Sequence, residues 1–139
     1  MEKQARIEDL HTNDRALIDA YSGKNVVAIS PIVVRALHSN AGAALFISQL
    51  IYESKVHADE EGWFYCVQAD LYEHTGLAPD SQLKYRKQLC KMGILEEKLA
   101  GIPAKVYYRI NFARYADMLK SAYEKHEAEF YRRKPAKKA

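Results

Sequence analysis

Apolar residues recur at helical spacing along most of the 139-residue chain, which predicts a mainly helical domain. The most apolar stretch, residues 41–56, predicts the central core helix, and its small residues 41–44 permit close packing. The expected buried face of this helix consists of Leu45, Phe46, Gln49, Leu50, Tyr52 and Val56. Residues 2–21 predict another helix that is interrupted near Asn13, where a second helical piece begins.

The segment before the core helix joins a β-branched run to a proline. Residues 26–29 predict a short strand. Ser30 as N-cap and Pro31 at the first helical position then predict a helix. Residues 38–40 predict a turn in which Asn40 caps the core helix. Beyond the core helix, the aromatic run 63–67 predicts a second strand.

Residues 68–112 predict a helix, a tight turn, a second helix and a β-hairpin. Gly76 suits the left-handed position that ends the first helix. Pro79 lies near the start of the second helix, residues 80–92, and Gly93 stops it. The apolar spacing of the second helix places Gln82, Tyr85, Leu89 and Met92 on an inner stripe.

The opposite face of the second helix is basic, as a groove-binding helix requires. On such helices the first residues reach base edges, while later basic residues meet phosphates. The residues expected near bases are Ser81, Gln82, Lys84 and Tyr85, and those expected at phosphates are Arg86, Lys87, Gln88 and Lys91. Gln82 and Tyr85 also belong to the inner stripe, which is expected to face the core. These two residues are therefore predicted both to be buried and to contact bases, and the two predictions conflict. The alternative is a solvated helix face.

The hairpin is predicted from alternation in its second strand. Strands are expected at about 94–99 and 105–111, with residues 100–103 at the tip. Val106, Tyr108 and Ile110 fall on one face, and Lys105, Tyr107 and Arg109 fall on the other. Within this basic wing, residues 96–109, the expected DNA contacts are Lys98, Lys105 and Tyr107.

Charge supports this location for a phosphate-facing surface. The chain carries a net charge of only +3, but residues 57–80 hold six acids and no Lys or Arg. Residues 81–109 hold seven bases against two acids, which gives +5, and residues 132–139 add five bases. Positive charge is therefore concentrated in the second helix, the hairpin and the tail.

The runs ADLYEHTGL and KYRKQLCKMGILEEKLAGIPAKVYYRIN resemble the winged helix-turn-helix domains of replication-initiator and replisome-organiser proteins from phages, plasmids and bacteria. The resemblance also includes NAGAALFISQLIYESK and GWFY, and covers roughly residues 40–112. It implies an α+β fold, mainly α with a small antiparallel β-hairpin, in which a winged helix-turn-helix carries additional N- and C-terminal helices. The chain departs from many relatives at residues 78–80, where Ala-Pro-Asp replaces a polar or basic residue. A winged helix that serves protein contacts is the alternative.

Residues 113–131 predict a long amphipathic helix with a short heptad seam. The seam residues are Phe112, Ala116, Leu119, Tyr123, His126 and Phe130. Leu119, Tyr123, His126 and Phe130 are the expected contacts of a homodimer, and the alternative is packing within one chain. Residues 132–139 are expected to form a disordered basic tail, which either contacts phosphates or only solvates the chain. Residues 1–131 then form a single domain.

Other chemistry finds little support in the sequence. Cys66 and Cys90 lack metal-ligand spacing and are interpreted as reduced, mostly buried residues. The five histidines are scattered, and no Gly-rich phosphate loop is visible. We therefore expect no enzyme, no cofactor and no metal site. No signal peptide or membrane span is evident in the sequence, so we expect a cytoplasmic protein. The motif and its charge predict that this protein binds double-stranded DNA and regulates transcription or replication of a mobile element. The alternative is an accessory interaction protein whose winged helix or C-terminal helix docks on a protein partner.

Overall fold

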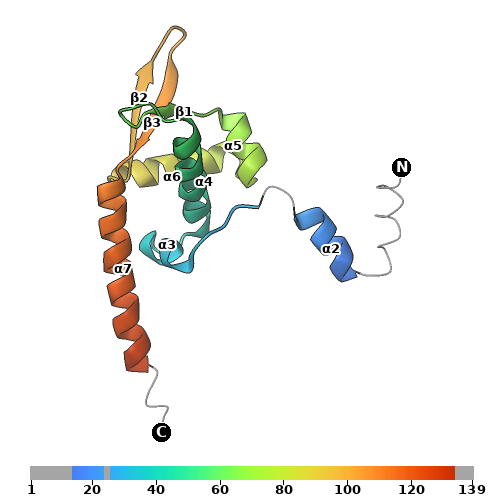
Figure 1. Ribbon diagram of the computed structural model, residues 1–139, viewed down its shortest axis with the longest axis vertical. Coiled ribbons are helices and arrows are strands. Elements are labelled where there is room, and N and C mark those ends of the chain that lie inside the picture. The colour runs from blue at the N-terminus through green and yellow to red at the C-terminus, as the bar shows by residue number, and fades with distance from the viewer. Residues whose placement is uncertain (1–13, 24–25, 134–139) are drawn as a thin grey trace.

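The computed structural model describes residues 14–23 and 26–133 of the chain (Figure 1). Within them the fold is mainly helical with a small antiparallel sheet, as the sequence predicts at this coarse level. The elements are α2 (Asp14–Ser22), α3 (Pro31–Ala36), α4 (Ala41–His57), β1 (Phe64–Tyr65), α5 (Gln68–Thr75), α6 (Pro79–Lys91), β2 (Leu95–Ala100), β3 (Lys105–Ile110) and α7 (Phe112–Arg133).

Helix α4 is the central element, and α3, α5, α6, β1 and β3 all contact it. It begins as predicted, because the Asn40 side chain accepts a hydrogen bond from the backbone N–H of Ala43 at 3.0 Å. Phe46 and Leu50 are fully buried on it. The predicted burial is wrong for Tyr52 and Val56, which are 59% and 55% exposed.

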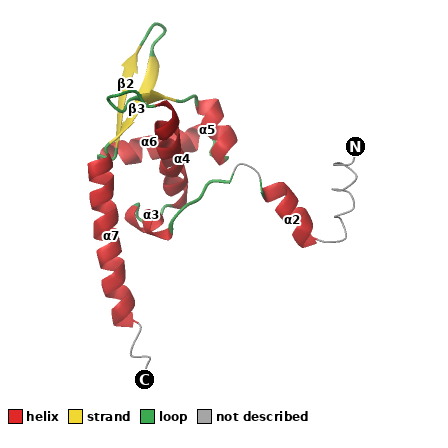
Figure 2. Cartoon of the chain, viewed as in Figure 1, coloured by secondary structure: helices red, strands yellow, loops and turns green. Residues whose placement is uncertain are grey.

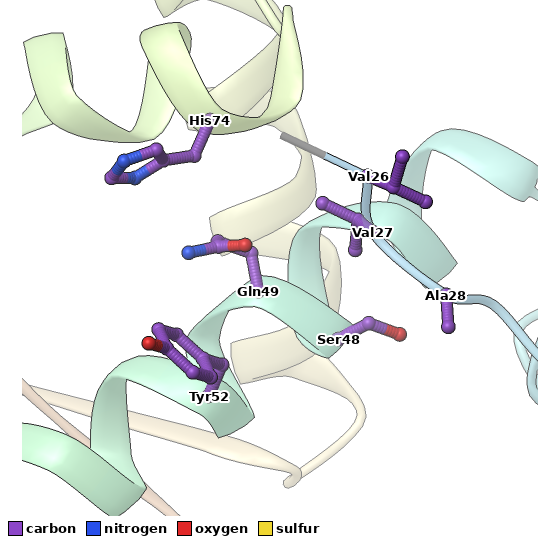
Figure 3. A pocket seen from close by; sticks show the side chains of 7 residues that line it. All are labelled: Val26, Val27, Ala28, Ser48, Gln49, Tyr52 and His74. Carbon is purple, nitrogen blue, oxygen red and sulfur yellow. The ribbon is translucent and has the colours of Figure 1, made fainter. Parts of the chain in front are cut away.

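The predicted strand at 26–29 is not formed. Residues 26–28 run alongside α4, where Val26, Val27 and Ala28 line a shallow pocket with Tyr52 and His74 (Figure 3). A strand needs a neighbouring edge to bond with, and the sheet lies on another part of α4. Helix α3 then begins as predicted, with Ser30 as N-cap and a proline in the first turn.

The three strands form one antiparallel sheet in the order β1–β3–β2. The hairpin register runs from Leu95 opposite Ile110 to Ala100 opposite Lys105. Strand β1 is shorter than the predicted 63–67, and it places Phe64 opposite Tyr108. Figure 2 shows the tip of the hairpin projecting beyond the helices, with α6 and the start of α7 near its base.

Helix α7 packs against α3 of its own chain, and Tyr115 is buried there. It continues to Arg133, two residues beyond its predicted end, so only residues 134–139 of the expected tail lie outside the described residues. The first helical piece expected within residues 2–13 also lies outside them. Helix α2 begins where the second piece is predicted, and none of its residues is buried.

Gly42 permits the closest approach between α4 and α6. A Cβ at this position would overlap the phenol ring of Tyr85, which also packs on the Phe46 ring with centroids 6.4 Å apart. The absent side chain is therefore what lets the hydroxyl end of the Tyr85 ring approach the first turn of α4.

Gly42→Ala should lower the free energy of unfolding by about 1–3 kcal/mol, because the methyl group displaces the Tyr85 ring. An alanine at an uncrowded helical glycine would instead stabilise the fold by up to ~1 kcal/mol. Denaturant unfolding measures the change, and the matched comparison is Gly42→Ala in a Tyr85→Leu background. If the substitution is equally harmful in both backgrounds, the ring is not the obstacle.

Candidate nucleic-acid interface

Helix α6 places its inner stripe against the core as the spacing predicts. Leu89 and Gln82 are 0% and 1% exposed, while Tyr85 and Met92 are half-buried. Gly76 adopts the predicted left-handed conformation with φ 76°, which ends α5 and turns the chain toward α6. The helix therefore turns its other side, with Lys84, Lys87 and Lys91, to solvent.

Gln82 is not a base-reading residue, contrary to the expectation for the start of α6. Its side-chain Nε2 donates to the backbone oxygens of Gln68 at 3.1 Å and Leu77 at 2.9 Å. These two bonds tie the start of α5 and the turn after it to α6. The buried Gln82 amide therefore has a structural role. Its removal would leave two backbone carbonyl groups without a hydrogen-bond donor, which destabilises the fold.

Tyr85 is likewise corrected to a supporting role. Its ring lies over Gly42 and beside Phe46, so it packs α6 on α4. Gln88 is half-buried and accepts a hydrogen bond from the Asn40 side chain at 3.2 Å. The residue that caps α4 is thus also held by α6.

Arg86 is engaged within the chain and is not a free phosphate contact. Its Nε and one terminal nitrogen donate to the two carboxylate oxygens of Glu97 on β2, at 2.9 and 3.2 Å. The guanidinium also lies over the Tyr108 ring, 5.7 Å from the centroid. The hydrogen bond to Glu97 raises the pKa of Arg86 above its usual value, and burial raises the pKa of Tyr108 to about 12. This bidentate pair connects α6 to the hairpin.

The remaining predicted contacts of α6 differ in exposure. Lys84, Lys87 and Lys91 are exposed, and none of them forms an ion pair with another described residue. Ser81 is half-buried at the start of the helix. Leu83, which the sequence analysis did not single out, is 41% exposed in the same first turns. The accessible cations of α6 are therefore three lysines.

The outward face of the sheet carries the predicted hairpin residues together with two aromatics that the sequence analysis missed. The Lys98 ammonium lies 4.3 Å from the centroid of the Trp63 ring, and the Lys105 ammonium lies 4.9 Å from that of Tyr65. Tyr107 pairs with Tyr65 across the strands, with ring centroids 5.7 Å apart. Alternation within 63–67 was the available signal, since it puts residues 63 and 65 on the face opposite Phe64.

Arg109, on the same outward face, forms an ion pair. It donates to Glu96 at 2.8 Å and lies over the Trp63 ring, 4.6 Å from the centroid. The hydrogen bond to Glu96 raises its pKa. Both arginines of the predicted motif thus pair with the two adjacent glutamates of β2.

The predicted dimer contacts on α7 do not share one environment. Leu119 and His126 are half-buried, whereas Tyr123 and Phe130 are 53% and 39% exposed. The Tyr123 hydroxyl donates to Glu127 at 2.8 Å, and the His126 ring lies 6.2 Å from that of Phe130. Helix α7, which carries these four residues, also packs on α3 of its own chain.

A polar cluster at the end of α4 is built around the buried carboxylate of Glu53. Gln49 donates to it at 2.9 Å, and nitrogens of His57 and His74 lie 3.6 and 3.9 Å from its oxygens. Burial, followed by the charge of Glu53, raises the pKa of the nearby Cys66 thiol to about 12. Cys66 and Cys90 are free and only partly buried. No group of three or more potential ligands among the described residues fits a metal ion.

Comparison of the chain with protein-family models, curated protein sequences and solved structures returns no match. Among residues 14–23 and 26–133, no helix has the length and apolarity to cross a membrane.

Gln82→Glu should destabilise the fold by about 3 kcal/mol at pH 7, because an ionised carboxylate would face two backbone carbonyl oxygens in a buried site. Burial raises the folded-state pKa of that carboxyl, so the loss is complete at neutral pH. It shrinks as the pH falls through the raised value toward the unfolded ~4.3. Thermal unfolding at several pH values measures this. Gln82→Met is the control and should give a smaller loss without pH dependence; identical pH profiles for both variants would contradict the assignment.

Proposed function

We propose that the protein binds double-stranded DNA as a winged helix, with α6 in the major groove and the β2–β3 hairpin as the wing. The observation that carries the proposal is the row of lysines on the exposed side of α6, none of which forms an ion pair with another described residue. Lys84, Lys87 and Lys91 lie at i, i+3 and i+7, which spans about 10 Å along one side of a helix. Phosphate groups that line a groove are the partners such a row fits best.

The architecture supports the same proposal. The order helix, strand, two helices and hairpin matches the winged helix-turn-helix arrangement that the sequence motifs resemble. The second helix of the pair lies next to the hairpin and is bonded to it through Arg86 and Glu97. A helix held against a hairpin in this way can present both elements to one duplex without reorganising.

The proposed biological role is regulation of transcription or replication of a phage or plasmid in the cytoplasm, with the protein acting as a homodimer. The resemblance of residues 40–112 to replication-initiator domains supports this role. A dimer doubles the number of phosphate contacts, which compensates for the short row of cations on one copy. The exposed Tyr123 and Phe130 of α7 provide apolar surface for the pairing.

Docking on a protein partner is the second candidate function. It is favoured by α2, where Ile18 and Tyr21 are 61% and 65% exposed on a helix with no buried residue. Partner binding of that kind would be insensitive to the lysines of α6, which separates the two candidates.

Lys84→Ala combined with Lys87→Ala should weaken duplex binding at all sequences and lower the slope of log K against log salt by ~1.8, or ~0.9 for each lost phosphate contact. Fluorescence anisotropy of a labelled duplex over a salt series measures the slope. The matched control is Lys55→Ala with Lys120→Ala, which removes the same charge from α4 and α7. If both double variants change the slope equally, net charge rather than α6 governs binding.

Selection of duplexes from a random pool at physiological salt should enrich palindromic sequences with half-sites ~10 base pairs apart, because a two-fold dimer reads two successive major grooves. Enrichment of a single asymmetric site would argue against the dimer. Recovery of no preferred sequence would argue against specific DNA binding as a whole.

A further inference from the structure

The outward face of the sheet is a small platform of aromatic rings edged by lysines. Trp63, Tyr65 and Tyr107 lie on this side, because their neighbours Phe64 and Tyr108 point into the core and are 1% and 5% exposed. Lys98 is directly opposite Tyr107 in the register, so β2, β3 and the β1 segment all contribute to one continuous surface. This aromatic platform is distinct from the exposed side of α6.

The cations of the aromatic platform differ in how they are paired, and acidic side chains lie nearby: Glu96, Glu61 and Asp59 all raise the pKa of Arg109. Arg109 is paired with Glu96, but neither Lys98 nor Lys105 forms an ion pair with a described carboxylate. Both lysines instead lie over rings, at 4.3 Å from Trp63 and 4.9 Å from Tyr65. The Asp59 carboxylate accepts the backbone N–H groups of Trp63 and Glu61 on one oxygen, and these bonds, together with the nearby Lys98 charge, lower its pKa. A phosphate at Lys98 or Lys105 would therefore not have to displace a direct ion pair with a described carboxylate.

The aromatic rings of the platform are partly exposed to solvent, so a flat ligand group could contact them. Tyr65 is 37% exposed, and Trp63 and Tyr107 are half-buried. A flexible lysine lying over a ring can move aside and let another flat group take its place, because a cation–π contact at an exposed site contributes only ~0.5–1 kcal/mol. The lysine, once displaced, stays within reach of the incoming group's charge.

Flat aromatic groups joined by phosphates are the chemistry that matches this surface. Nucleobases stack on aromatic side chains irrespective of sequence, while nearby cations neutralise the backbone. In a duplex the faces of the bases are already stacked on each other, so only a single strand can offer them. An acidic peptide would use the lysines but would gain nothing from three rings.

We propose that the aromatic platform binds single-stranded nucleic acid, with bases stacked on Tyr65 and Tyr107 next to Trp63, and phosphates at Lys98 and Lys105. This goes beyond duplex binding by α6, and it gives Lys98, Lys105 and Tyr107 on the hairpin a single-stranded ligand in place of the duplex contact expected from the sequence. A protein with both surfaces would hold a duplex and an adjacent unpaired strand at once.

Trp63 is the one tryptophan of the chain, so its fluorescence reports on the aromatic platform alone. Titration of the protein with an oligothymidylate of ~12 nucleotides should quench this emission, a length within the range that single-strand modules occupy. Tyr65→Ala should weaken the binding about five- to a hundredfold, as the loss of one stacking partner does. Tyr65→Phe keeps the ring and should bind like the unaltered protein.

Tyr52→Ala is the matched control, since it removes a more exposed tyrosine from α4 and should leave the affinity unchanged. Circular dichroism of every variant verifies that it is folded. The proposal is overturned if the oligothymidylate does not quench Trp63, if Tyr65→Ala binds as well as the unaltered protein, or if polyglutamate quenches equally at the same charge. Loss of single-strand binding in the Lys84→Ala, Lys87→Ala variant alone would move the site to α6 and also overturn it. Duplex binding is measured separately on each variant, so the single-strand proposal and the duplex proposal can each fail without deciding the other.

Discussion

The structure depends on how closely α6 approaches the first turn of α4. Gly42 has no side chain, and the Tyr85 ring occupies the space. Around this contact, Asn40 caps α4 with one side-chain atom and donates to Gln88 with another. The two helices are therefore joined by steric fit and by hydrogen bonds at the same place. This junction sets the rotation of α6 about its own axis, and that rotation decides which lysines face solvent.

The second fixed relation is between α6 and the sheet. Gln82 binds α6 to the turn that precedes it, and Arg86 binds it to β2 through Glu97. The two glutamates of β2 form ion pairs with both arginines of the region, whereas its lysines form none with the residues that the structure describes. The charge excess of residues 81–109 is consequently carried at the surface by lysines, on α6 and on the hairpin.

Local signals were sufficient for much of this fold. Asn40, Gly76 and the inner stripe of α6 each act within a few residues, so their consequences could be predicted from the sequence. The expected strand at 26–29 was wrong because β-branched composition cannot show whether a sheet edge lies nearby. The pairing of Arg86 was also beyond reach, since Glu97 belongs to the next element and meets it only after the chain reverses at Gly93. The contribution of Trp63 and Tyr65 to the sheet face likewise required the β1–β3 register.

The occupation of both arginines has a consequence for how a duplex would be read by α6. A guanidinium that bonds two acceptors of guanine at once is the commonest specific contact in the major groove. The Arg86 guanidinium already donates two hydrogen bonds to Glu97, and the amide oxygen of Gln88 already accepts one from Asn40. The side chains left on the exposed helix are single-point donors, which discriminate weakly among bases. Under the proposed function, target choice would then depend on the groove width and deformability of the DNA more than on its base edges.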